Sequence, residues 1–65
     1  MTEEEKYEQF PGLLELKKEC EKVKLNTKEY WKLRSQYLEK TLDQTYSLFE
    51  RNNCREFYII LKNRE

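Results

Sequence analysis

Residues 22–37, KVKLNTKEYWKLRSQY, decide how this chain folds. The stretch has the pattern of a helix end, a short turn at 25–27 and the start of a second helix. Asn26 is a good residue to cap the second helix, and Glu29 three residues later completes a capping-box pattern. Before the turn, one apolar stripe recurs at helical spacing, and its members are Leu13, Leu16, Cys20 and Val23. We therefore predict one helix over about 12–24 and another that begins near residue 27.

Three further elements follow from the residues around this stretch. Thr2 and Glu5 form a capping pattern that predicts a short helix over about 3–9, and Pro11 separates it from the next helix. No glycine or proline interrupts residues 27–51, so a single long helix is predicted there, ended by the asparagines of 51–53. The tail, residues 54–62, favours a short fourth helix because Phe57, Ile60 and Leu61 share a helical face. Its aromatic and β-branched residues also suit a strand paired with another chain.

Composition supports a helical fold. Charged residues make up 40% of the 65-residue chain, while glycine and proline occur once each, as in helices with solvated charged faces. A domain of this size hides only roughly 60% of its unfolded surface, so association would add to its stability. We predict an all-α fold: a small helical bundle of three to four helices with one long central helix (about 27–51), in a single domain (1–65), completed by dimerisation.

The chain lacks the side chains that most catalytic and metal sites need. It has no histidine and two cysteines, Cys20 and Cys54, which leaves too few ligands for a zinc site and no imidazole base for a nucleophile. Cys20 falls on the apolar stripe and is expected to be a small buried hydrophobic residue. We expect a non-enzyme with no cofactor, no metal and no small-molecule substrate.

Targeting and membrane signals are also missing from the sequence. No apolar run approaches 18 residues, and the acidic start, MTEEEKYEQF, is unlike a signal peptide. Two cysteines outside any disulfide-dense framework suggest free thiols in a reducing compartment. We expect an intracellular, cytoplasmic protein that does not bind membranes.

The predicted third helix carries more apolar surface than one packed layer needs. One explanation is a central helix that contacts neighbours on both sides. The other is that Tyr30, Leu33 and Tyr37 face the core, while a coiled-coil-like seam packs on a second chain. The residues of that seam and its edge are the predicted partner-binding residues, namely Trp31, Arg34, Leu38, Leu42 and Phe49.

The stretch around the turn also resembles a helix-turn-helix motif. Cys20, Val23, Leu25, Tyr30 and Leu33 occupy the small and apolar positions of that motif, although Lys24 stands where it usually has glycine. The resemblance covers about residues 16–36. It implies DNA contacts from the second helix, through Thr27, Lys28, Lys32 and Ser35. A net charge of zero and a pI of about 6.3 count against nucleic-acid binding.

Three functions therefore stand as hypotheses. The first is a small regulatory protein, of the adaptor or inhibitor type, that binds another protein and forms a homodimer through its third helix. The alternative is a DNA-binding regulator that uses residues 16–36. The third is a structural subunit whose apolar tail, 57–61, becomes ordered only within a larger assembly.

Overall fold

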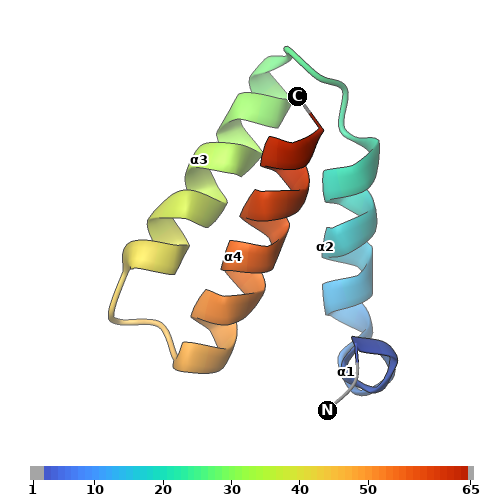
Figure 1. Cartoon of the computed structure of the whole chain (residues 1–65), viewed down its shortest axis with the longest axis vertical. Helices are drawn as coiled ribbons and strands as arrows, with labels where there is room; N and C mark the ends of the chain where they lie inside the picture. The colour runs from blue at the N-terminus through green and yellow to red at the C-terminus, as the bar shows by residue number, and fades with distance from the viewer. Residues whose placement is uncertain (1–2, 65) are drawn as a thin grey trace.

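The computed structural model describes residues 3–64, which form four helices and no strand. The helices are α1 (Glu3–Gln9), α2 (Pro11–Lys22), α3 (Lys28–Leu42) and α4 (Leu48–Asn63). α4 lies between α2 and α3, and α3 runs in the opposite direction to both (Figure 1). The short α1 turns away from the foot of α2, at the end where α3 and α4 are joined. The predicted all-α fold and small helical bundle are confirmed.

The long central helix over 27–51 is wrong, because the chain turns between Leu42 and Leu48. Asp43 Oδ1 accepts hydrogen bonds from the backbone N–H of Thr45 at 2.9 Å and from its hydroxyl at 2.7 Å. These bonds lower the pKa of Asp43 and fix a turn that needs neither glycine nor proline. Ser47 then caps α4 by accepting from the backbone N–H of Glu50 at 3.2 Å. The chain consequently forms an α3–α4 hairpin in place of one rod.

The remaining helix ends are close to those predicted. α1 has the predicted bounds, although its proposed cap, Thr2, lies outside the described residues. Pro11 is the first residue of α2, where its missing N–H has no cost. The cap of α3 is Thr27 and not Asn26: the Thr27 hydroxyl accepts from Tyr30 N at 3.3 Å, while Asn26 adopts a left-handed φ of 61°.

The tail is helical, as favoured, but it is the second half of α4 and not a separate element. The predicted helix end at residues 51–53 is wrong, and Asn53 is buried in the middle of α4. Phe57 and Leu61 share one helical face and are almost fully buried. Because these residues belong to the core, the tail packs within the chain, where the structural-subunit hypothesis expected an exposed segment; Ile59 within it is 43% exposed.

The core joins α2, α3 and α4 through five buried side chains: Cys20, Tyr30, Tyr37, Phe57 and Leu61. The rings of Tyr37 and Phe57 pack with centroids 5.3 Å apart. Tyr30 donates its hydroxyl proton to the carbonyl of Leu61 at 2.7 Å, and the side chains of Tyr37 and Cys20 are hydrogen-bonded to each other. Both tyrosines of this core thus have a partner for their hydroxyl groups, as burial requires.

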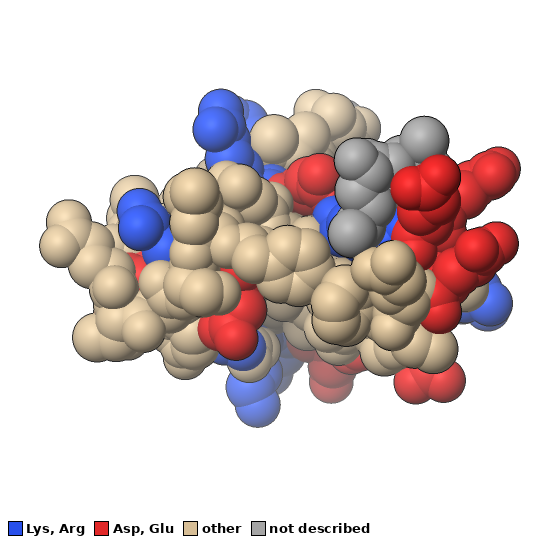
Figure 2. All heavy atoms as spheres, turned by 90° about the horizontal axis from the view of Figure 1, so that it is seen from below, with Lys and Arg blue, Asp and Glu red and all other residues tan. Residues whose placement is uncertain are grey.

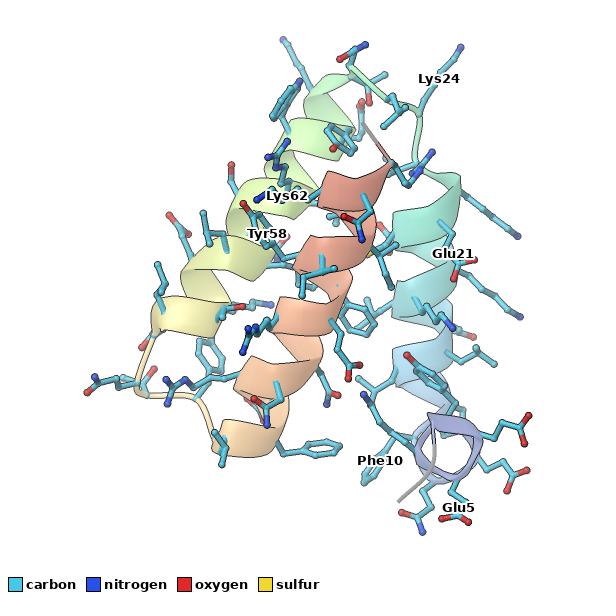
Figure 3. The ribbon with its side chains drawn as sticks, in the orientation of Figure 1. Glu5, Phe10, Glu21, Lys24, Tyr58 and Lys62 are labelled. Carbon is cyan, nitrogen blue, oxygen red and sulfur yellow. The ribbon has the colours of Figure 1, made fainter. Side chains whose placement is uncertain are left out.

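α2 is attached less extensively than α3, mainly at its two ends. Near its C-terminus, Arg64 Nη1 donates to the carbonyl of Cys20 at 2.7 Å. Near its N-terminus, the rings of Phe10 and Phe49 lie 5.2 Å apart, and Figure 3 shows Phe10 directed toward the start of α4. From the turn that joins them, α2 and α3 diverge on the two sides of α4 (Figure 1), and both contribute walls to the groove described below.

Candidate protein-binding surfaces

One apolar surface lies along α3, on the side turned away from the core. We call it the outer face and define it by Trp31, Ser35, Leu38 and Leu42. These residues follow one another at intervals of four, three and four, the spacing of a coiled-coil seam. Trp31 is 47% exposed, Leu38 39% and Leu42 71%, so the described residues leave this face uncovered. An apolar row of this kind on a small protein is typical of an interaction site.

Arg34 lies at the edge of the outer face and is half-buried. Its guanidinium carbon is 5.2 Å from the Trp31 ring and 5.7 Å from the Tyr58 ring, which places the cation between two aromatic side chains. Figure 3 shows Tyr58 on the side of α4 that faces α3. Arg34 therefore holds the indole of Trp31 in place and links the outer face to α4.

Phe49 does not belong to the outer face, although the sequence placed it there. That assignment required one continuous helix, and the turn at residues 43–47 puts Phe49 on α4 instead. Its ring packs against Phe10 of the α1–α2 junction. The other predicted partner-binding residues, Trp31, Arg34, Leu38 and Leu42, are brought together on or beside one face of α3.

The residues of the DNA-binding hypothesis lie at the N-cap and along the first half of α3. Lys28, Lys32 and Ser35 are exposed, but the Thr27 hydroxyl is used within the turn, where it donates to the carbonyl of Lys24 at 2.7 Å. α2 and α3 lie on opposite flanks of α4 and run in opposite directions (Figure 1). A helix-turn-helix instead crosses its two helices steeply so that the second can enter the major groove. The arrangement of the helices thus gives this hypothesis no support.

A second apolar surface was not foreseen from the sequence. It is a cavity of about 710 Å³ with walls from α2 and α3 and a floor from α4, which we call the inner groove. Its apolar lining comprises Phe10, Leu13, Leu16, Leu33, Tyr37, Tyr46, Phe49 and Phe57. Phe10, Leu16, Tyr46 and Phe49 are each more than a third exposed, because no side chain of the described residues fills the space above them.

The inner groove continues toward the other end of α2. A second hollow of about 650 Å³ shares Glu19, Leu33 and Gln36 with the first and extends to Lys22 and Glu29. The two hollows follow α2 from its first turn to its last. At a rise of about 1.5 Å per residue, the 12 residues of α2 span about 18 Å. The inner groove is therefore about three helical turns long.

Charge is distributed unevenly around these surfaces. Seen from the end that carries α1, carboxylates gather beside α1, and uncharged side chains cover the middle of the view (Figure 2). Lys24 lies at the end of the molecule opposite Glu5 (Figure 3). The neutral net charge thus conceals an acidic α1 end and lysines around the turn that connects α2 to α3.

The two cysteines are free thiols in different surroundings. Cys20 is fully buried, and burial raises the pKa of its thiol to about 11. Cys54 is partly exposed on the floor of the inner groove, where partial burial also raises its pKa. Both thiols are held in the protonated form, which reacts slowly. Neither surrounding is that of an activated nucleophile.

The described part of the chain has neither a cluster of metal ligands nor a membrane-spanning helix. No three or more cysteine or acidic side chains within residues 3–64 are placed to hold a metal ion together. In the same residues no helix has both the length and the apolar character needed to cross a membrane.

The chain matches no known protein family, no curated protein and no solved structure. The two apolar surfaces are therefore the features on which a function can be based.

Proposed function

We propose that this chain is a non-catalytic regulatory protein that acts by binding proteins, and that it self-associates through the outer face of α3. The observation that carries the proposal is the exposure of Trp31, Leu38 and Leu42 in one row on a helix whose opposite side is already packed in the core. Leaving three large apolar side chains in water has a cost that a second surface removes. The occupant we assign to this face is a second copy of the chain.

The charges beside the outer face favour a second copy in antiparallel orientation. Lys32 and Glu39 are exposed, lie seven residues apart and flank the same side of the apolar row. When two α3 helices pack antiparallel about a twofold axis between Ser35 and Leu38, Trp31 of each copy lies against Leu42 of the other. Lys32 of each copy then lies near Glu39 of the other, so that opposite charges meet twice. The outer face is thus complementary to itself, as a twofold interface must be.

Sedimentation equilibrium on the purified protein tests this proposal, beside a Leu38→Glu, Leu42→Glu variant. Because both leucines are exposed, the variant keeps its helical circular-dichroism spectrum. The expected result is a dimer for the original protein and a monomer for the variant. A folded monomer for the original protein at high micromolar concentration would exclude self-association.

Two further parts of the proposal depend on the cysteines and on the missing catalytic groups. We infer a cytoplasmic location because both cysteines are unpaired, as is usual for proteins in reducing compartments. We infer a role without catalysis because both thiols are held protonated and the sequence contains no histidine.

A further inference from the structure

The inner groove lies on the other side of α3 from the outer face. Of the residues that line it, only Lys32, on its rim, also takes part in the proposed self-association. Leu33 and Lys40 of α3 line it, while Trp31, Leu38 and Leu42 do not. Its floor is α4 and its walls are α2 and α3, so it occupies the place that one more full-length helix would take in a bundle. Its length of about three turns also suits a single helix.

We propose that the inner groove binds an amphipathic helix of another protein. Its occupant needs an apolar stripe to cover Phe10, Leu16 and Phe49, which are exposed without it. A helix is convex and inserts such a stripe into a groove between two others, with anchors at i, i+3, i+4 and i+7. A second copy of this chain that presented its outer face to the groove would produce an open chain of molecules in place of a closed dimer.

The rim of the groove specifies the polar residues of that helix. On the α3 side the rim carries Lys32 and Lys40, with Glu29 at its far end. On the α2 side it carries Glu19, with Lys22 at the far end, and Glu50 lies at the end where α4 begins. A helix that fits has acidic side chains beside Lys32 and Lys40 of α3, and basic side chains beside Glu19 and Glu50 on the opposite flank. This complementarity selects the partner and its direction more than it adds affinity.

The chain contains its own reporters for this groove. Cys54 lies on the groove floor and is partly exposed, so a thiol reagent reaches it when the groove is empty. Cys20 is fully buried and serves as the internal control that reacts only when the protein unfolds. A helix seated in the groove covers Cys54 and leaves Cys20 unchanged.

The probe for the test is a synthetic amphipathic peptide of about 16 residues. It has leucines at i, i+3, i+4 and i+7, glutamates along one flank and lysines along the other. Two peptides with the same leucines, one with only glutamates and one with only lysines on both flanks, are its controls. We expect saturable binding of the mixed peptide, weaker binding of both controls, and at least about tenfold slower alkylation of Cys54 at saturation.

Two leucine variants provide a matched comparison, because both side chains are exposed and each receives the same charge. Leu16→Glu puts a carboxylate on the groove wall and is expected to weaken peptide binding by more than about tenfold. Leu42→Glu alters only the outer face and is expected to leave peptide binding unchanged. Lys40→Glu, on the rim, should weaken binding of the mixed peptide about threefold at low salt and less at high salt.

Both inferences concern protein binding, but this set of variants separates them. Leu42→Glu is expected to weaken self-association and to leave peptide binding unchanged. Leu16→Glu is expected to weaken peptide binding and to leave self-association unchanged. The groove proposal is overturned if none of the peptides binds, or if binding leaves Cys54 as reactive as before. It is also overturned if Cys54 becomes protected simply by concentrating the protein, because a second copy then fills the groove.

Discussion

The large side chains that α3 buries on its inward side are more polar than those it exposes on its outward side, which is the reverse of the usual pattern. The inward side buries Tyr30 and Tyr37, both of which carry a hydroxyl, whereas the outward side exposes Trp31, Leu38 and Leu42. Each buried hydroxyl requires a specific hydrogen-bond partner, and the structure supplies one from α4 and one from α2. The more apolar side chains have been left in water. Since two buried positions of α3 hold tyrosines, its large apolar side chains are not exposed for lack of room in the core. Their exposure is what a binding surface on α3 requires.

The largest expected effect is on the free energy of unfolding, when loss of the Tyr37 ring on the inward side is compared with loss of the Trp31 ring on the outward side. Tyr37→Ala removes a side chain that is only 4% exposed and packs on Phe57, and is expected to cost about 3–5 kcal/mol of unfolding free energy. For a domain of this size that loss leaves little or no folded protein. Trp31→Ala should cost less than about 1.5 kcal/mol and still reduce self-association. Urea denaturation followed by circular dichroism measures both, and equal losses would mean that the two sides do not differ.

Alkaline pH is expected to weaken the inward side alone. Burial raises the pKa of Cys20 to about 11 and raises that of Tyr37 as well. Because the protonated thiol is favoured in the folded state, its stabilising effect is complete below the unfolded pKa near 9. It is lost as pH rises toward 11, on the order of 2 kcal/mol by that pH. The unfolding free energy, measured from pH 8 to 11, should fall less steeply in Cys20→Ala, and identical slopes would contradict this prediction.

The buried hydroxyl of Tyr30 offers a smaller test. Tyr30→Phe keeps the ring but removes the donor to the Leu61 carbonyl, and should cost about 1–2 kcal/mol. The matched change Tyr58→Phe alters a half-buried ring beside Arg34 and should cost less than about 0.5 kcal/mol. Thermal unfolding of the two variants compares them directly. Equal decreases in the melting temperature would show that the hydrogen bond from Tyr30 to Leu61 adds no stability of its own.

The smallest effect concerns the charges that flank the outward side. Lys32→Glu places like charges together in the antiparallel dimer and should weaken dimerisation about threefold to tenfold at low salt. Adding Glu39→Lys to the same chain exchanges the two charges and should restore the original dissociation constant. Sedimentation equilibrium at two salt concentrations measures both variants. Failure of the double exchange to restore association would mean that the two helices do not pair in antiparallel register.

Much of the fold could be predicted from local patterns, because each correct element has its signal within a few residues. The stripe from Leu13 to Val23 indicated α2, and the spacing of Phe57, Ile60 and Leu61 indicated the helical tail. The α3–α4 turn was missed because glycine and proline were taken as the signals for a break. Its actual signals are Asp43 with Thr45, and Ser47 with Glu50, whose hydrogen bonds end one helix and start the next.

The two candidate surfaces were predictable to different degrees, because only one of them depends on residues close together in the sequence. The outer face depends on spacing within one helix, so the sequence indicated Trp31, Leu38 and Leu42, and erred only at Phe49, beyond the unforeseen turn. The inner groove depends on how far α2 and α3 diverge around α4, which is a property of packing between elements. Leu16 and Phe10 could be recognised as apolar, but whether another helix would cover them could not be predicted locally.

Fluorescence of Trp31 as a function of protein concentration tests the central claim most directly. Trp31 is the single tryptophan of the chain, lies on the outer face and is 47% exposed in one copy. Self-association through this face predicts that its emission shifts to shorter wavelength as concentration rises, with the midpoint at the dissociation constant from sedimentation. It also predicts no shift for the Leu38→Glu, Leu42→Glu variant. An emission spectrum that stays the same at every concentration while the protein forms dimers would show that α3 does not form the interface.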